Sequence, residues 1–362
     1  RGFRMTEASP APTAPPSRGF WRETWHRFRS ERLAFAALCF IAAMGVAAVL
    51  APFVAGTRPI VCSYKGRVYF PFLEYYFEGG QSGVFLQDGF LDSFPANLKK
   101  KDPSSWAVFP LLYVDPFRRV DADEREGQAR DPSRGPPTLR NLLGTDDRGY
   151  DVLALVLYGS RTALLVGLLS MTIAAAIGVI LGALAGYFGG IADLAISRAI
   201  ELALSIPTIV LILALRSVIA QPNLFHLVAV IGLTRWETIA RYTRAEFLRL
   251  REQDFVLAAR ALGSPWHRII FRHILPNALA PVIVTLTFGI AQAILLESAL
   301  SFLGFSAAGA DASWGKTLSN WQSNRECWWL AVFPGLAIFL SVLAYNLIAD
   351  GFQQATDPRQ RN

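Results

Sequence analysis

Long apolar runs without charged residues dominate the chain and predict transmembrane helices. A helix needs about 20 residues to cross a bilayer. Four runs that contain no Asp, Glu, Lys or Arg are long enough, namely residues 33–57, 162–187, 274–296 and 327–349. Each of these runs is predicted to be a helix that spans a membrane.

Two shorter apolar runs raise the expected number of spans to six. Residues 202–215 and 221–234 lie between charged residues and cover 14 residues each. The first run reaches spanning length when residues 199–201 are included, which places Glu201 near a helix end or facing other helices. Together the two runs predict a helical hairpin that turns at residues 221–223. Four spans are the alternative, and either number leaves both chain ends on the same side.

Composition agrees with a membrane protein. Of the 362 residues, 52% are apolar and 17% are charged, whereas soluble domains carry about 25% charged residues. The chain is therefore neither a disordered protein nor a nucleic-acid-binding tail, although its formal net charge is +7.

The distribution of arginine predicts the orientation in the membrane, because short cytoplasmic loops are enriched in Lys and Arg. Residues 1–32 hold seven Arg and residues 235–272 hold eight, whereas the long segment 57–161 holds 14 basic and 14 acidic residues. Both termini and the loop 235–273 are therefore predicted to be cytoplasmic.

The chain ahead of the first span is predicted to have two parts. Residues 1–18 contain a Pro-rich stretch and are expected to be disordered. Residues 19–32 place Trp21, Trp25 and Phe28 on one face with arginines between them, which predicts a helix lying at the cytoplasmic interface of the membrane. The alternative is that they are only the charged flank of the first span.

The segment 58–161, between the first two spans, is far longer than a connection needs. Residues 68–73 and 75–77 are rich in aromatic residues that favour strands, and glycines follow them. We expect a small extracytoplasmic subdomain over residues 58–118, and an exposed charged loop over residues 121–137. The subdomain would serve as a docking surface for a soluble partner or substrate, or only as a cap that stabilises the helices.

The three cysteines are too few for a disulfide scaffold and lack the paired spacing of a zinc site. Cys62 follows the first span and Cys327 precedes the last, so both are expected at the outer face, where an oxidising compartment would join them. The sequence leaves open whether their Cα atoms come within about 7 Å, as a disulfide requires. Cys39 lies within the first span and is expected to be a small apolar packing residue.

A short amphipathic helix is predicted in the Arg-rich loop. It covers residues 254–263 and ends at a glycine. Its apolar face consists of Phe255, Ala258, Ala259 and Leu262. Such a face, flanked by Arg, suits a cleft on another protein, and the alternative is a helix that rests on lipid. Residues 267–273 form a second amphipathic stretch that leads into the fifth span.

Several segments resemble one family of membrane transport proteins. Ala258-Ala259 and Gly263, with Leu275-Pro276 twelve residues beyond that glycine, resemble the EAA loop of bacterial ABC-importer permeases. Residues 268–277 resemble the oligopeptide/dipeptide/nickel branch of these permeases. The segments 143–153 and 301–305 agree with that branch, and the resemblance extends over residues 140–358 together with the first span. Within the branch, Tyr69-Phe70-Pro71 in the long loop resembles the permeases of microcin C and antimicrobial-peptide importers.

The resemblance implies a type I ABC-importer permease, an all-α polytopic protein of the bacterial inner membrane with six transmembrane helices and a large periplasmic insertion. It implies a second homologous permease subunit and two cytoplasmic ATP-binding subunits, which would bind ATP and Mg²⁺. It also implies a periplasmic binding protein that delivers peptides or peptide-like compounds. No cofactor is expected on this chain itself. Nickel or another small solute is the alternative substrate.

The resemblance identifies the loop helix as a coupling helix that is seated in a groove on an ATP-binding subunit. Its expected contact residues are Phe255, Ala258, Ala259, Arg260, Leu262 and Gly263, with Arg260 at the rim. The family motif has Glu where this chain has Leu257, so no carboxylate contact is expected at that position.

Polar and ionisable residues inside the predicted spans are candidates for function, because each is costly in hydrocarbon. The candidates for the translocation path are Gln292, Glu297, Ser298 and Ser301, toward the outer end of the fifth span. There Glu297 would attract the amino terminus of a peptide. The alternative is an ion pair between Glu297 and Arg161 or Arg216.

Two further polar pairs have simpler interpretations. Arg198 and Glu201 are three residues apart on one helix and are expected to pair locally. Asn346 and Asp350 are expected to mark the cytoplasmic exit of the last span. The permease core is therefore predicted over residues 162–350, and residues 351–362 are predicted to form a cytoplasmic tail.

No catalytic or metal site is predicted on this chain. Residues 309–317 have five residues between their glycines, whereas a Walker phosphate loop needs four. The histidines, His26, His226, His267 and His273, lack metal-binding spacing, and no serine lies in a G-x-S-x-G turn. These observations disfavour a membrane hydrolase, and the EAA-like loop disfavours a channel or carrier that works without an ATPase.

Overall fold

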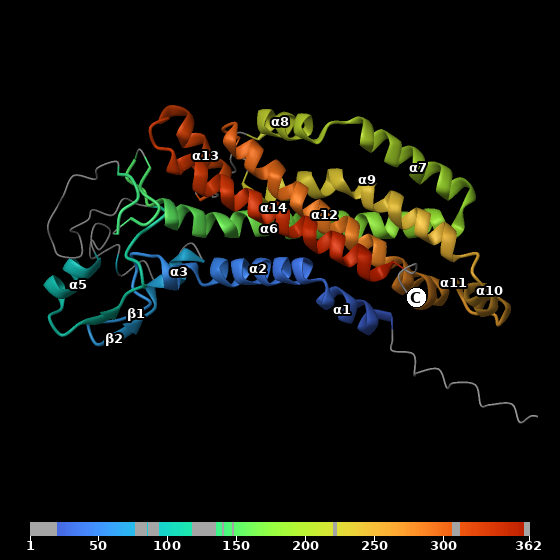
Figure 1. The fold of residues 1–362 in the computed structure, drawn as a ribbon, viewed down its shortest axis with the longest axis horizontal. Helices are drawn as coiled ribbons and strands as arrows, with labels where there is room; N and C mark the ends of the chain where they lie inside the picture. Colours follow the sequence, from blue (N-terminus) through green and yellow to red (C-terminus); the bar gives the residue numbers. More distant parts are fainter. Residues whose placement is uncertain are drawn as a thin grey trace, which may run out of the picture.

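The computed structural model describes residues 20–76, 85, 94–117, 135–139, 141–146, 148–219, 223–305 and 312–357, so the N-terminal tail of residues 1–18 lies outside them. Long helices run side by side through most of the molecule, with a small sheet at one end and short helices at the other (Figure 1).

The helices are α1 (Phe20–Ser30), α2 (Arg32–Val49), α3 (Ala51–Val54), α5 (Phe94–Lys101), α6 (Val152–Phe188), α7 (Gly190–Ser205), α8 (Thr208–Val218), α9 (Leu224–Leu250), α10 (Asp254–Ala261), α11 (Trp266–Arg268), the π-helical stretch η2 (Ile269–Ile274), α12 (Leu275–Phe302), α13 (Trp314–Ser323) and α14 (Trp329–Thr356). The sheet contains β1 (Val61–Tyr64), β2 (Arg67–Tyr69) and β3 (Trp106–Val108), and the 3₁₀ helix η1 (Pro71–Tyr75) follows β2.

The predicted membrane-spanning bundle is confirmed for most of its helices. Four helical segments are long and apolar enough to cross a membrane, namely α2, α6, α14 and the continuous helix 266–302. A fifth candidate is the pair α7 and α8, which bends by 72° at the break between them. The sixth long helix of the bundle is α9, with 27 residues. It carries more charged residues than the other long helices and is therefore not among the segments that are apolar enough to span a membrane by themselves.

Helix α9 is longer than the predicted span 221–234 and takes in the first sixteen residues of the predicted loop 235–273. The reason is close packing against α6, which presents Gly178, Gly182 and Gly186 at intervals of four. We call these three residues the glycine seam. A Cβ atom built on Gly182 would lie 2.5 Å from the backbone oxygen of Ala240 in α9. Small residues at this spacing let two helix backbones approach closely.

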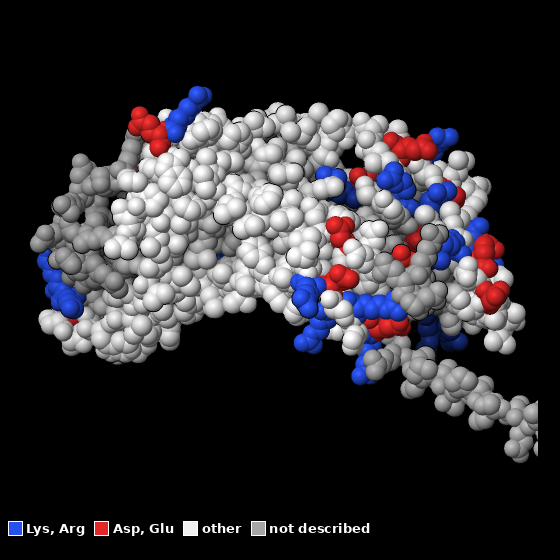
Figure 2. All heavy atoms as spheres, viewed as in Figure 1, with Lys and Arg blue, Asp and Glu red and all other residues white. Residues whose placement is uncertain are grey.

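Charged side chains are concentrated at one end of the molecule. On the face in Figure 2, the middle of the bundle shows almost none, and most of them gather at the end that carries α1, α10 and α11. A smaller number lies at the opposite end, near the sheet. This uncharged belt between two charged ends is the surface expected of a protein that spans a membrane.

The predicted all-α class is confirmed for the membrane-spanning bundle, and the insertion between α2 and α6 contains the strands that its aromatic residues favour. It contains a three-stranded antiparallel sheet in the order β2–β1–β3. The strand expected over residues 68–73 ends at Tyr69, because Pro71 begins the 3₁₀ helix η1. The same helix occupies Tyr75, where a second strand was expected. Most of the predicted loop 121–137 lies outside the described residues.

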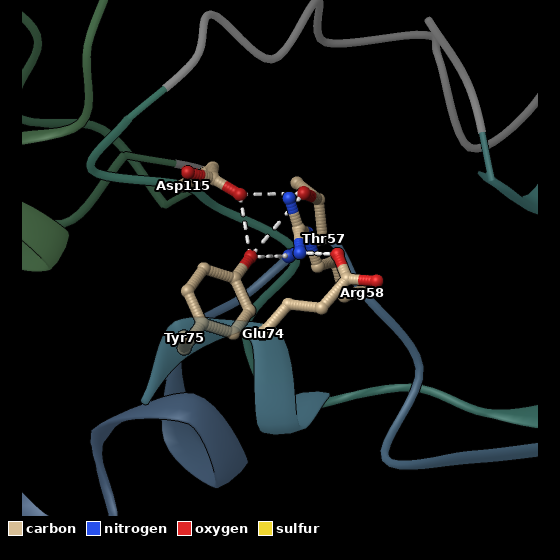
Figure 3. A network of polar contacts seen from close by, with 5 residues as sticks. All are labelled: Thr57, Arg58, Glu74, Tyr75 and Asp115. Atoms are coloured by element: carbon tan, nitrogen blue, oxygen red, sulfur yellow. Dashed lines mark hydrogen bonds and ion pairs between the residues drawn. The ribbon is translucent and has the colours of Figure 1, made fainter. Parts of the chain in front are cut away.

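A polar network fastens distant parts of the insertion to one another (Figure 3). Thr57 Oγ1 and the Tyr75 hydroxyl donate to Asp115 Oδ2 at 2.6 and 2.5 Å. Arg58 forms an ion pair with Glu74 and lies over the Tyr75 ring. Burial, with the nearby Asp115 charge, raises the pKa of the Tyr75 hydroxyl, which therefore remains a donor. The network joins the start of the insertion to a segment 58 residues further along the chain.

Helix α6 begins ten residues before the predicted second span. Asp151 caps it, because its side chain accepts a hydrogen bond from the Ala154 backbone N–H at 3.0 Å. Arg161 lies inside the helix, whereas its charge was taken to mark the N-terminal limit of the predicted span 162–187. Its Nε donates to the Ala48 backbone oxygen in α2 at 2.6 Å. The arginine therefore ties the second long helix of the bundle to the first.

The N-terminal helix is tied to the last helix of the bundle. Helix α14 extends to Thr356, six residues past Asp350, so the predicted tail 351–362 is helical at its start. The ring of Phe352 lies 5.9 Å from Phe28 and 6.5 Å from Trp21, both in α1. The aromatic face predicted for a membrane interface is therefore partly used to contact α14.

The disulfide between Cys62 and Cys327, which the sequence left open, is not formed in the structure, because the two residues lie in separate buried clusters. Cys62 packs with Tyr64 and other residues of the insertion, where burial raises the pKa of its thiol to about 11. Cys327 packs with Trp329 at the start of α14. Cys39, which was expected to pack in the core, is exposed on α2.

Candidate functional site

Helix α10 is held against the end of the bundle by a small apolar cluster. Its residue Val256 is fully buried, in a cluster with Phe247 of α9, Ile270 and Ile274 of η2, and neighbouring residues of α6 and α12. Ala259, one turn further along α10, is also buried. The inner face of α10 is therefore continuous with the ends of three long helices.

The outer face of α10 is apolar and uncovered among the described residues. Phe255 is 43% exposed and Leu262 is 87% exposed, and Ala258 and Arg260 are exposed beside them. The sequence prediction also placed Ala259 on this face, which is wrong because Ala259 pairs with Val256 on the inner side. We call the set Phe255, Ala258, Arg260 and Leu262 the outer face of α10.

The C-terminus of α10 is fixed by a Schellman motif at Gly263. The Gly263 N–H donates to the Arg260 oxygen at 3.0 Å, and the Ser264 N–H donates to the Ala259 oxygen at 3.1 Å. Gly263 has φ +73°, which disfavours residues with a Cβ atom. No atom lies within 4 Å of a Cβ atom built there, so a side chain at this position would project into open space.

The chain leaves α10 directly into a transmembrane helix. The Trp266 ring lies 5.7 Å from the Phe188 ring at the end of α6. From Trp266 the helix continues through η2 into α12 without a break, as far as Phe302. The predicted second amphipathic stretch, residues 267–273, is therefore the first part of this long helix.

Of the candidates for the translocation path, Glu297, Ser298 and Ser301 lie together, whereas Gln292 lies elsewhere on α12. Glu297 is buried and accepts hydrogen bonds from the Ser301 and Ser313 hydroxyls, each at 2.8 Å, and from Ser298 at 3.3 Å. These contacts fasten α12 to the start of α13. The predicted ion pair with Arg161 is wrong, because that arginine binds backbone oxygens of α2 and the insertion.

Gln292 lies on a different face of α12, in a polar cleft of about 240 Å³. The polar residues that line this cleft are Arg235, Thr238 and Tyr242 from α9, and Thr285 and Gln292 from α12. Five residues of helix separate Gln292 from Glu297, which turns the two side chains about 140° apart. Sequence reasoning missed Arg235, because its charge was taken to mark the end of a span.

Two segments that resemble the family form tight turns at helix ends. In the first, Asp146 Oδ1 accepts hydrogen bonds from the backbone N–H groups of Arg148 and Tyr150, at 2.9 and 2.8 Å. In the second, Gly304 has φ +84° and ends α12 with a Schellman motif. Both segments therefore shape the helix ends of the bundle.

The remaining polar candidates have local roles. Arg198 and Glu201 form the predicted pair at 2.6 Å, on an exposed face of α7. His226 and Asn223 form a capping box at the start of α9. Asn346 lines an apolar groove beside α12, α13 and α14. Among the described residues, no group of three or more His, Cys, Asp and Glu side chains is placed to hold a metal ion.

The fold and these sites define a polytopic membrane protein that presents a supported, partly apolar helix at the charged end of its bundle. Residues 178–362 match the family model described as binding-protein-dependent transport system inner membrane component. Residues 19–65 match the N-terminal TM domain of oligopeptide transport permease C.

Two relatives match nearly the whole chain, and a third matches about three fifths of it. The chain is 34% identical over 338 residues to the inner membrane ABC transporter permease protein YejE of Escherichia coli (strain K12), covering 93% of this chain and 96% of the relative. It is 32% identical to the peptidoglycan transport system permease protein YejE of Agrobacterium fabrum, covering 98% and 99%. It is 40% identical to the dipeptide transport system permease protein DppC of Alkalihalophilus pseudofirmus, covering 62% and 74%.

The chain therefore belongs to the family of binding-protein-dependent transport system inner membrane components. It is a membrane permease, and its relatives are permease subunits of ABC transporters.

Proposed function

We propose that this chain is a permease subunit of an ATP-driven importer that carries peptides or peptide-like compounds across the bacterial inner membrane. It would work with a second permease subunit, two ATP-binding subunits that hydrolyse ATP, and a periplasmic binding protein. The substrate class is supported by the dipeptide and peptidoglycan transport names of two relatives. Nickel or another small solute is the alternative substrate, and a channel without an ATPase is the alternative mechanism.

The observation that carries this proposal is the two-sided construction of α10. Its inner face is packed on the ends of α6, α9 and η2, and its outer face offers Phe255 and Leu262 to a partner. A helix of this kind can transmit a force, because a displacement of α10 must also move the helices it packs against. A partner whose contact changes with nucleotide state would then shift the bundle between two arrangements.

The charged end of the bundle supports an orientation with both termini and α10 in the cytoplasm. Arginines of α1 and of the C-terminal half of α9 lie at this end, and cytoplasmic segments are enriched in such residues. The insertion with its sheet would then lie in the periplasm, where the binding protein docks.

Substitution of Gly263 tests the role of α10. We expect Gly263→Arg to abolish peptide uptake and substrate-stimulated ATP hydrolysis in the assembled transporter, because its side chain would project from the end of the outer face. Gly263→Asn is the control for backbone strain, because Asn tolerates a positive φ better than other residues. Gly66→Arg is the control for membrane insertion, because Gly66 shares φ +73° and open surroundings but lies in the β1–β2 turn.

Normal uptake by the Gly263→Arg transporter would refute the assignment of α10. Loss of uptake in Gly263→Asn as well would attribute the effect to the backbone turn instead of to docking. Mass spectrometry of proteins that copurify with the tagged wild-type chain in mild detergent tests the partners directly. We expect a second permease and P-loop ATPases, and recovery of the chain alone would favour a channel or carrier.

A further inference from the structure

Arg235 occupies an unusual position in the bundle. It is eleven residues from the start of α9 and fifteen from its end, which places it about 16 and 22 Å along the helix from the two ends. The cleft residues Thr285 and Gln292 lie ten residues inside opposite ends of α12. The cleft is therefore at the middle height of the bundle, where a charged side chain is costly unless it faces water or a partner.

The guanidinium of Arg235 lacks a counter-ion in the described part of the chain. Its Nε atom is buried and has no hydrogen-bond partner, and no carboxylate pairs with it among the described residues. The acidic residue two positions along α9, Glu237, is buried, and its Oε1 accepts a hydrogen bond from Thr238 while its Oε2 has no partner among the described residues. Residues two positions apart on a helix do not face each other, so Glu237 does not pair with Arg235. An arginine with unused donors at this depth indicates that an anionic group from outside these residues binds there.

The donors that remain available in the cleft favour an anion rather than a cation. The Thr285 and Thr238 hydroxyls already donate to the Pro281 oxygen and to Glu237, so the donors left for a ligand come from Arg235 and Gln292. Gln292 has no side-chain hydrogen bond to the described residues, so its amide N–H group is an available donor in the cleft that Arg235 also lines. The described lining contains no Asp or Glu. An arginine and an amide donor in one cleft suit a carboxylate, which accepts several hydrogen bonds and pairs with guanidinium groups.

We propose that this cleft is a carboxylate subsite on the translocation path, where Arg235 and Gln292 bind a carboxylate of the transported peptide. The inference rests on the proposed function for the identity of the ligand. Met171 of α6 and Gly289 of α12 form part of the apolar wall of the cleft, so the cleft accepts a short side chain or a chain end beside the carboxylate.

The test compares a peptide that has a carboxylate with the same peptide without one. The probes are tri-alanine and tri-alanine amide, delivered by the same binding protein to the complete transporter in proteoliposomes. We expect Arg235→Gln to lower tri-alanine uptake by about tenfold to a hundredfold, the loss typical of a hydrogen bond to a charged group. Amide uptake should change by less than about threefold, because the amide offers Arg235 no charge. Uptake of each peptide by a variant is divided by uptake of the same peptide by the wild type, so any preference of the binding protein for one peptide cancels.

Two further variants sharpen the comparison. Arg235→Lys keeps the charge but not the paired donors, so we expect an intermediate loss for the acid. Arg198→Gln removes an exposed arginine outside the cleft and should leave the uptake of both tri-alanine and its amide at the wild-type level. Equal losses for acid and amide in Arg235→Gln, especially with reduced recovery of the second permease, would overturn the proposal and indicate a pair with an acidic residue of that subunit.

Direct binding separates failure of the subsite from failure of the proposed function. If the wild-type transporter imports neither probe, the proposed function fails for this substrate. Isothermal titration of the nanodisc complex then decides the subsite. Tri-alanine binding that is lost in Arg235→Gln and absent for the amide supports the proposal, whereas equal binding of acid and amide, or no binding of either, overturns it.

Discussion

The glycine seam between α6 and α9 makes a strong prediction about stability. Substituting Gly182 by Ala adds one methyl group at the closest approach of the two helices. The new Cβ atom would lie 2.5 Å from the Ala240 oxygen and 2.7 Å from Thr243 Cβ. Ordinary contacts between such atoms are about 3.5–4.0 Å long, so α9 must recede by about 1 Å.

The expected cost follows from this overpacking. Inserting a methyl group into a well-packed interface costs about 1–3 kcal/mol. The same substitution in an open helix position gains about 0.5–1 kcal/mol, because Ala favours helix over Gly. Gly45 in α2 and Gly335 in α14 are matched controls, because nothing lies within 4 Å of a Cβ atom built on either. Gly182 also lies within a helix and shares this gain, so Gly182→Ala should be less stable than either control by the overpacking cost alone, about 1–3 kcal/mol.

Thermal unfolding of the purified transporter in one detergent measures this difference. We expect the unfolding midpoint of Gly182→Ala to fall below that of the wild type, and the midpoints of Gly45→Ala and Gly335→Ala to stay level or rise. Equal midpoints for Gly182→Ala and the two controls would refute the close approach of α6 and α9 and, with it, the rigid support proposed for α10.

Two further predictions concern titratable groups in and beside the insertion. Burial raises the pKa of Asp151 from 3.8 to about 6, so the folded state binds this proton more tightly than the unfolded state. The contribution of this carboxyl to the free energy of unfolding therefore falls as pH rises from about 4 to about 6, by at most about 3 kcal/mol. Asp151→Asn keeps an N-cap acceptor and should reduce that pH dependence of the unfolding midpoint, and an unchanged pH profile would contradict the burial of this carboxyl. Because burial raises the pKa of the Cys62 thiol to about 11, Cys62 should react with iodoacetamide at pH 8 much more slowly in the folded protein than after unfolding in SDS, and rapid labelling in the folded protein would contradict its burial. Non-reducing electrophoresis should show no shift on reduction.

Sequence patterns predicted the elements that depend on local chemistry. The apolar runs located the spans of α2, α6, α12 and α14, and the terminal glycine located the end of α10. Periodicity could not decide which face of α10 points outward, since Val256 and Ala259 form an equally regular apolar pair. For this reason the sequence placed Ala259 on the wrong side.

The missed features depend on contacts between distant residues. Charge ended the predicted spans at Arg161 and Arg235, yet backbone oxygens of α2 accommodate the first arginine and a polar cleft accommodates the second. The distance between Cys62 and Cys327 depends on how the insertion folds over the bundle. The sheet was harder to predict than the helices, because its three strands are only three or four residues long.

The π-helical stretch η2 has a mechanical consequence for the connection between α10 and the membrane. A π turn holds an additional residue relative to an α turn. If η2 converted to α-helix, the extra residue would be displaced along the chain, and the helix on one side would rotate by about 100° relative to the other. One such step would turn Gln292 away from Arg235 without unwinding α12. The segment Ile269–Ile274 therefore lies where a shift of the π turn would couple a displacement of α10 to a rotation of α12 at mid-membrane depth.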